Sequence, residues 1–189
     1  FTVVDVADAS TIGPALKDQA PADITGLCYC MGDIVLKPFK RASPADYLNC
    51  FSLHVVGAAE ALKVVEAPLK KNGGSVVLFS TVAVQQGFTN HAVISSAKGA
   101  VEGLTRALAA EYAPKVRVNA IAPSISESAM AAPMLGKEAM AQALAKAHPL
   151  QRTGVGDDSA ALASFLLSDD AGWITGQIIG VDGGRHAVA

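Results

Sequence analysis

The chain has 189 residues, of which 51% are hydrophobic and 17% charged, and its formal net charge is −2. This high apolar and low charged content excludes a disordered chain or a coiled coil, and the length suits one domain. No cluster of Lys and Arg indicates a nucleic-acid surface, and no run of about 18 apolar residues indicates a membrane span. We therefore expect a single globular domain over residues 1–189 that binds neither nucleic acid nor membrane.

The predicted elements follow one another as apolar runs that alternate with longer helical patterns. Ser43 and Pro44 have the residue types of a helix cap and first helical position. Short apolar runs bounded by turn residues predict strands, and the longer runs before Pro68, Pro114 and Pro149 predict helices. In chain order the prediction is strand 1–6, helix 10–17, strand 24–31, helix 44–65, strand 75–80, helix 90–112, strand 116–121, helix 137–147, helix 157–168 and strand 177–181.

Strand–helix alternation at this spacing predicts an α/β fold with a doubly wound, mostly parallel sheet and helices on both faces. Ligands of such sheets bind at the carboxyl ends of the strands. The residues that directly follow the predicted strands are therefore candidate site residues: Asp5, Met31, Gly32, Ser80, Thr81, Pro123, Ser124, Gly183 and Gly184.

The cysteine count and the first residues bear on location. Cys28, Cys30 and Cys50 cannot all pair within the chain, which favours a reducing, cytoplasmic location. Cys28 and Cys30 lie in an apolar run and are interpreted as small core residues rather than metal ligands. Residues 1–5 lack the basic segment of a signal peptide.

Two long motifs carry a family resemblance. The first reads SSAKGAVEGLT over 95–105, AAEY over 109–112 and VRVNAIAP over 116–123, and the second reads WITGQIIGVDGG over 173–184. With weaker matches at Asp5-Val6 and Gly32, the chain resembles the short-chain dehydrogenase/reductase family over essentially all 189 residues. The resemblance implies a three-layer Rossmann-like fold and an NAD- or NADP-dependent oxidoreductase that acts on a carbonyl or alcohol.

One departure from the family lies at the start of the chain. The Gly-rich turn that holds the cofactor pyrophosphate has no counterpart, and the family's first two strand–helix units are missing. We expect about 50 further residues to precede Phe1, a length set by those units, and a shortened protein is the alternative. The residue that selects NAD or NADP follows the second family strand, so the choice between them stays open.

The second departure lies in the catalytic motif. The family pattern is Tyr-x-x-x-Lys on one helix face, and here Lys98 is present while Ile94 stands in the tyrosine position. An aliphatic side chain cannot transfer the proton that accompanies hydride transfer. Thr81 stands thirteen residues before Ile94, where the family has the serine that binds the substrate carbonyl.

Two histidines lie near these positions. His91 shares a helical face with Lys98 and is a candidate general acid, or else a structural histidine at the helix start. His54 takes the place of a family asparagine and could order water, or be a satisfied, buried histidine. The candidate catalytic residues are Thr81, His91 and Lys98, and the resemblance implies cofactor contacts from Asp5, Val6, Met31, Gly32, Lys98, Pro123, Ser124 and Ile125.

The lid composition and the family resemblance also suggest binding partners. The segment 124–147 is the expected substrate lid, and its small apolar residues suggest a small-molecule substrate with an apolar body. The resemblance implies a homo-oligomer, a tetramer that packs through helices 44–65 and 90–112, where small residues of the second helix allow close approach. The alternative function is a non-catalytic relative with a cofactor-binding, ligand-sensing or structural role.

Overall fold

The computed structural model describes residues 4–188 and contains one parallel sheet. Its strands are β1 (Gly26–Cys28), β2 (Ser75–Phe79), β3 (Arg117–Pro123) and β4 (Ile178–Val181), in the spatial order β1-β2-β3-β4. All three neighbouring pairs are parallel, with Leu27 opposite Val76 and Val76 opposite Val118. This confirms the predicted α/β fold with a parallel sheet.

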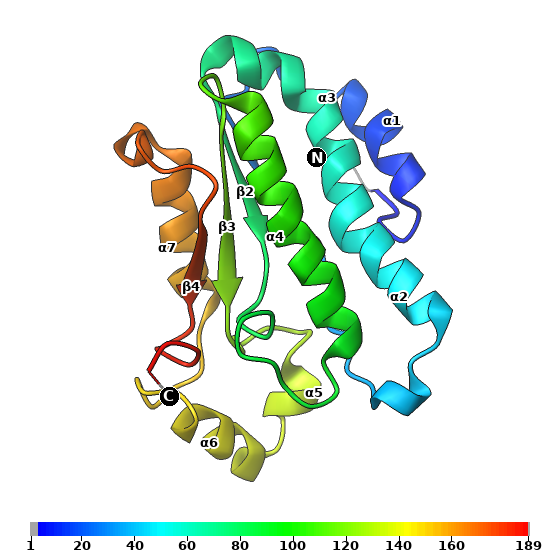
Figure 1. Cartoon of the computed structure of the whole chain (residues 1–189), viewed down its shortest axis with the longest axis vertical. Helices are drawn as coiled ribbons and strands as arrows, with labels where there is room; N and C mark the ends of the chain where they lie inside the picture. Colours follow the sequence, from blue (N-terminus) through cyan, green and yellow to red (C-terminus); the bar gives the residue numbers. More distant parts are fainter. Residues whose placement is uncertain (1–3, 189) are drawn as a thin grey trace.

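Helices cover both faces of this sheet (Figure 1). On one face lie α2 (Pro44–Phe51), α3 (Gly57–Asn72) and α4 (Ala92–Tyr112), and on the other lies α7 (Gly156–Leu167). Strand periodicity explains the division: in β2, Val76 and Leu78 pack with α3 and α4, whereas Val77 packs with α7. The remaining helical segments are Ala9–Thr11, α1 (Ile12–Lys17), Phe39–Arg41, α5 (Ala132–Leu135), α6 (Glu138–Lys146) and Asp169–Ala171.

The helix expected over 44–65 is longer than predicted. It begins as expected, because Ser43 Oγ accepts a hydrogen bond from the Asp46 N–H while the Asp46 carboxylate accepts one from the Ser43 N–H. It then continues through Pro68 to Asn72, so Pro68 does not end it. Val65 and Leu69 on either side of Pro68 are buried against the sheet, and this packing outweighs the lost backbone hydrogen bond.

A π-helical segment, Ser52–Val56, joins α2 to α3. The helical run Pro44–Asn72 therefore has 29 residues, and an 18-residue window within it has a mean hydropathy of 1.3, so by length and composition the run could cross a membrane. Core helices also meet this criterion. Ala61, Leu62 and Leu69 of this run pack in the core, whereas Leu48 and Phe51 are exposed.

The strand expected over 1–6 is wrong where the structure describes it. Residues 1–3 lie outside the described part, and Val4, Asp5 and Val6 form no strand. Polar groups in this segment bond locally instead: the Asp5 carboxylate accepts the Ala7 N–H, and Thr11 Oγ1 donates to the Asp5 carbonyl. An apolar run becomes a strand only beside a partner strand, and β1 pairs with β2 alone among the described strands.

Other differences concern element ends. β1 keeps only three of the eight residues expected over 24–31, because pairing with β2 stops at Cys28. The helix expected over 10–17 begins with a separate short turn, Ala9–Thr11, whose capping residue is Asp8 rather than Ser10. The other predicted strands and helices are present with shifts of one or two residues.

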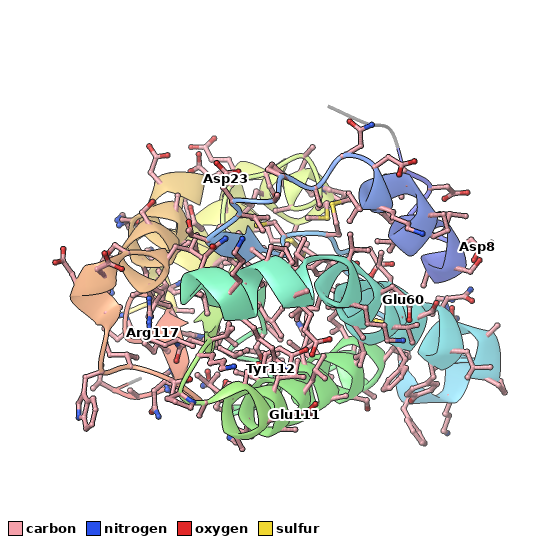
Figure 2. The ribbon with its side chains drawn as sticks, turned by 90° about the horizontal axis from the view of Figure 1, so that it is seen from above. Asp8, Asp23, Glu60, Glu111, Tyr112 and Arg117 are labelled. Atoms are coloured by element: carbon pink, nitrogen blue, oxygen red, sulfur yellow. The ribbon has the colours of Figure 1, made fainter. Side chains whose placement is uncertain are left out.

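The two ends of the sheet differ in what covers them. Figure 2 shows the amino-terminal end of the sheet from above, with Arg117 labelled. Arg117 donates hydrogen bonds of 2.8 Å to the carbonyls of Leu166 and Ser168 at the end of α7. Tyr112, at the end of α4, has the Lys70 ammonium 4.3 Å from its ring centroid. At the carboxyl end, the described residues include the loops after the strands and the short helices α5 and α6 (Figure 1). Ligands of parallel sheets bind at this end.

Candidate functional site

A cavity of about 510 Å³ lies at the carboxyl ends of the strands. Side chains and backbone from the ends of β1, β2 and β3, the start of α4 and the segment 124–148 surround it. Asp5 and Val6 do not line it, and Asp5 is exposed. The other candidate catalytic and cofactor-binding residues line it, namely Met31, Gly32, Thr81, His91, Lys98, Pro123, Ser124 and Ile125. Ser80 lines it as well, whereas Gly183 and Gly184 line a separate, smaller cavity.

Lys98 is a buried cation at the base of this cavity. Its side chain comes from α4, only 8% of the residue is exposed, and its Nζ donates a 2.7 Å hydrogen bond to the Phe79 carbonyl at the end of β2. Burial lowers the pKa of Lys98 to about 8, although nearby Cys50, Asp33 and Cys30 act in the opposite direction. The ammonium keeps two further protons for a ligand.

The hydroxyls of Ser80 and Thr81 have different roles. Ser80 Oγ donates a 2.8 Å hydrogen bond to the buried carboxylate of Glu102, so this hydroxyl is fully committed to the protein. Thr81 Oγ1 lies 3.5 Å from the Pro123 carbonyl and accepts a 3.3 Å bond from the Ala83 N–H. Both bonds are long, so Thr81 rather than Ser80 can turn its hydroxyl toward a ligand.

His91 precedes α4 and lines the cavity, with its ring 5.3 Å from that of Phe88. Its Nδ1 lies 2.8 Å from the Thr89 carbonyl. A carbonyl oxygen only accepts hydrogen bonds, so Nδ1 carries the proton in the neutral ring and Nε2 has the free lone pair. The interaction fits the structural role considered for His91 and leaves Nε2 available for proton transfer.

Ile94 lies one turn of α4 before Lys98 and is 5% exposed. It packs with Cys50, Val93 and Ala97 while also lining the cavity. Ile94 therefore presents an apolar side chain to the cavity.

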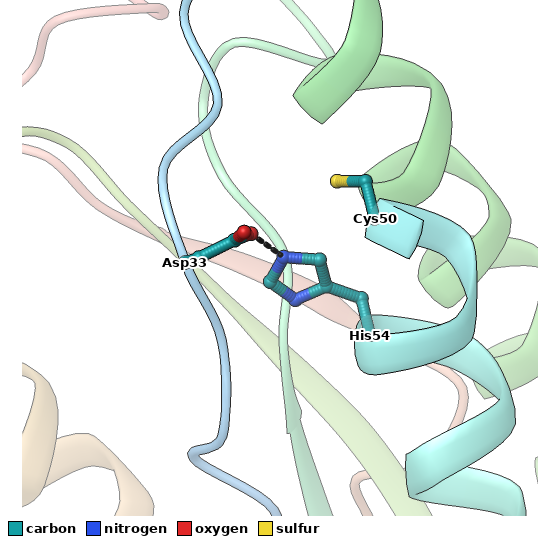
Figure 3. A group of neighbouring side chains, drawn as sticks. All are labelled: Asp33, Cys50 and His54. Atoms are coloured by element: carbon teal, nitrogen blue, oxygen red, sulfur yellow. Dashed lines mark hydrogen bonds and ion pairs between the residues drawn. The ribbon is translucent and has the colours of Figure 1, made fainter. Parts of the chain in front are cut away.

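His54 and Asp33 form a polar pair beside these residues (Figure 3). His54 is 2% exposed, its Nε2 lies 3.1 Å from an Asp33 oxygen, and its Nδ1 has no hydrogen-bond partner within the described residues. Burial, followed by the charge of Lys98, lowers the pKa of His54 to about 4. The ring is thus neutral near pH 7 and donates its Nε2 proton to Asp33.

Cys50 lies close enough to this pair for the three side chains to be considered as metal ligands (Figure 3). The potential ligand atoms of Asp33, Cys50 and His54 all lie within 4.8 Å of one another. Two observations oppose a cation there: the Lys98 ammonium acts on both His54 and Cys50, and burial raises the pKa of the Cys50 thiol to about 11. His54 Nδ1 also lacks the acceptor that metal-bound imidazoles normally have.

The expected lid segment closes one side of the cavity. Met130, Met134 and Leu144 line it, which gives this wall the apolar character expected from the sequence. His148, at the end of this segment, is 3% exposed and joins it to the site: its Nδ1 lies 2.6 Å from the Leu144 carbonyl and its Nε2 lies 2.8 Å from Ser124 Oγ.

Three residues of the site were not predicted from the sequence, namely Asp33, His148 and Arg185. Arg185 lines the cavity, donates to the Ala147 carbonyl and lies with its guanidinium 5.4 Å from the Phe88 ring centroid. The one available signal was chemical: Asp33 is a charged residue at the end of an otherwise apolar run.

Gly32 and His54 provide a test of this geometry. A Cβ at Gly32 would lie 2.6 Å from His54 Cε1, so Gly32→Ala should lower the free energy of unfolding by about 1–3 kcal/mol, measured by urea denaturation. In a His54→Ala background, Gly32→Ala should lower the free energy of unfolding much less, because the imidazole ring that the new Cβ would meet is absent. Gly103→Ala is the control, since a Cβ there would meet no described residue beyond its own helix within 4 Å. Equal costs in both backgrounds would contradict the close approach.

The low pKa of His54 predicts a pH dependence of stability. An unfolded histidine takes up a proton near pH 6.5, whereas folded His54 does so only near pH 4. Stability should therefore be lost as pH falls from about 6.5 to about 4, by roughly 3 kcal/mol. Urea denaturation at several pH values should show this loss, and His54→Gln should flatten it. An unchanged slope in the variant would assign the loss to other groups.

Comparison with known proteins agrees with this arrangement. The family model for enoyl-(acyl carrier protein) reductase matches residues 1–186. The chain is 35% identical to 2-(S)-hydroxypropyl-CoM dehydrogenase 3 of Xanthobacter autotrophicus, over 97% of this chain and 75% of the relative. It is 33% identical to the inactive 2-(S)-hydroxypropyl-CoM dehydrogenase 2 of the same organism, over 97% and 84%.

A solved structure extends the comparison to three dimensions. It is that of a candidate NAD(P)-dependent gluconate 5-dehydrogenase from Beutenbergia cavernae with bound NADP, with a TM-score of 0.91 and 28% identity. The match covers 98% of this chain and 76% of that one. With the family model and the relatives, it shows that the chain belongs to the short-chain dehydrogenase/reductase family of NAD(P)-dependent oxidoreductases.

Proposed function

We propose that the cavity is the site of an NAD(P)-dependent oxidation or reduction of a small alcohol or carbonyl compound, with a proton donor other than tyrosine. The observation that carries the proposal is the convergence of Thr81, His91 and Lys98 on one cavity at the carboxyl ends of the strands. The apolar wall formed by Met130, Met134 and Leu144 favours a substrate with an apolar body.

The residues present fit the nicotinamide end of the cofactor, which supplies or accepts the hydride when bound. Lys98 offers a desolvated ammonium with two unused protons for ribose hydroxyls. Met31, Gly32 and the segment Pro123, Ser124 and Ile125 supply the walls next to it. We also propose the adenine contact at Asp5 and Val6 that the family pattern implies, outside this cavity.

The proton step is assigned to His91. In the neutral ring Nε2 is a base that can take the proton of an alcohol, and in the imidazolium form it is an acid that can protonate a carbonyl oxygen. Thr81 would donate a hydrogen bond to that same oxygen, at the expense of its 3.5 Å interaction with Pro123.

Removing Lys98 tests the cofactor assignment. Lys98→Ala should weaken NAD(P)H binding by the loss of a charge-assisted hydrogen bond, about 1.5–3 kcal/mol or roughly 10–150-fold, measured by nicotinamide fluorescence in the full-length protein. Lys63→Ala, which removes a largely exposed ammonium paired with Glu60, should leave binding unchanged. Equal affinity of the Lys98→Ala variant and the wild type would argue against the ribose contact.

Two substitutions on α4 and its start test the proton step. His91→Ala should lower turnover of a carbonyl panel at least tenfold while NAD(P)H affinity holds, because a general acid contributes about 10²–10⁴-fold. Ile94→Tyr should raise turnover, since it restores a phenol one turn from Lys98. Ser96→Ala, on the exposed side of α4, is the control. A smaller loss in His91→Ala would leave that histidine a structural role only.

A second candidate function is cofactor or ligand binding without catalysis. The observation in its favour is Ile94, an apolar side chain where the family's proton donor stands. The 33% identity to a relative that is itself named inactive points the same way. If Ile94→Tyr binds NAD(P)H but turns over no member of the panel, this second function is the better one.

We further propose a cytoplasmic homo-oligomer, a tetramer formed through the helical run Pro44–Asn72 and α4. Exposed Leu48, Phe51 and Gly103 on these helices support this assembly. Ala97, one of the small residues expected on that surface, instead packs inward against Cys50.

A further inference from the structure

Cys28 and Cys30 form a pair that the proposed reaction does not use. Cys28 ends β1 and Cys30 follows two residues later, so on an extended chain both side chains point to the same side. Their Sγ atoms are 3.3 Å apart, and both residues are exposed. Cys30 also lines the main cavity, whereas Cys28 does not. The third cysteine, Cys50, is 1% exposed.

The surroundings give the two thiols different chemical roles. A hydrogen bond from Cys28 lowers the pKa of Cys30 to about 7; burial acts in the opposite direction, and the nearby charge of Lys98 adds a smaller lowering effect. The same hydrogen bond, together with burial, raises the pKa of Cys28. Near neutral pH Cys30 is therefore substantially a thiolate, while Cys28 keeps its proton and donates it to Cys30.

We propose that Cys28 and Cys30 are a reactive dithiol that low-molecular-weight disulfides oxidise to an intramolecular disulfide at the rim of the cavity. The Cys30 thiolate attacks one sulfur of the external disulfide, whose S–S bond breaks and releases one thiolate. Cys28 then loses its proton and attacks the Cys30 sulfur, which releases the second thiolate. The two cysteines lose two electrons and two protons, and the external disulfide is reduced to two thiols.

Geometry and exposure favour this outcome over a lasting mixed disulfide. The two Sγ atoms must approach by only roughly 1.3 Å to reach bonding distance. The attacked sulfur on Cys30 is therefore within immediate reach of Cys28. An exposed disulfide of this kind is readily reduced again, so the modification is reversible. The inference does not depend on the oxidoreductase activity of the site.

Oxidised glutathione is the probe, applied to the folded chain near neutral pH. Trypsin cuts after Lys and Arg except before Pro, so Cys28 and Cys30 fall in peptide 18–40 and Cys50 falls in peptide 42–63. Peptide 18–40 should lose the mass of two hydrogen atoms and regain it with dithiothreitol, while peptide 42–63 stays reduced. An unreactive peptide 18–40, a mixed disulfide that persists there, or preferential reaction of Cys50 would overturn the proposal.

Single variants separate the two roles. Cys28→Ser should stop the reaction at a glutathione adduct on Cys30, and Cys30→Ser should leave Cys28 largely unmodified. The pH dependence of Cys30 alkylation by iodoacetamide gives a second readout, with a midpoint near 7 in the wild type. Cys28→Ser keeps a donor and should hold this midpoint, whereas Cys28→Ala should raise it. A wild-type midpoint at the ordinary thiol value of about 8.5 would contradict the assigned roles.

Discussion

The packing of α4 across the sheet is the constraint on which the site depends. Lys98 from α4 donates to the carbonyl of Phe79, the last residue of β2, so helix and strand are joined at the point where the sheet ends. Thr81 follows Phe79 by two residues, and Ile94 and His91 precede Lys98 by one and two turns. One buried hydrogen bond therefore sets the distance from the ammonium to every group that could handle a proton. The burial that fixes it also lowers the pKa of Lys98.

The polar residues around this bond are few, and each has a partner that limits what it can do. Ser80 donates its hydroxyl proton to Glu102, and His54 donates its Nε2 proton to Asp33, so neither offers that proton to a ligand. His54 Nδ1 has no partner among the described residues and can still accept a hydrogen bond. His91 is held through Nδ1 alone. The family membership determines the class of chemistry. The hydrogen bonds that these side chains already make limit which of them can supply the proton. Ile94 itself adds only an apolar surface to this cavity.

Features that depend on residues near one another in the sequence could be predicted, and features that depend on contacts distant in the sequence could not. The helix over 90–112 could be predicted because a periodic pattern determines it. The family resemblance implied that Thr81 and Lys98 lie at one site, and helical spacing from Lys98 added His91. The conformation of residues 4–6 could not be predicted, since it depends on a partner strand. The continuation of the helix through Pro68 could not be predicted either, since it depends on core packing. The contact of His148 with Ser124 spans 24 residues of sequence and leaves no local pattern. The same is true of Arg185 above the Phe88 ring.

The π-helical segment Ser52–Val56 has a consequence for how this helix can vary. A π turn holds one residue more than an α turn, so deleting a single residue there would restore an unbroken α-helix. Because the wide turn already absorbs the extra residue, α2 and α3 would keep nearly the same faces toward α4. Cys50 and Tyr47 would stay packed against α4, and the change would fall on the π-helical segment itself, which carries His54 beside Gly32. Natural variation in length at this place should therefore act on the site through His54 and leave the packing of α2 unchanged.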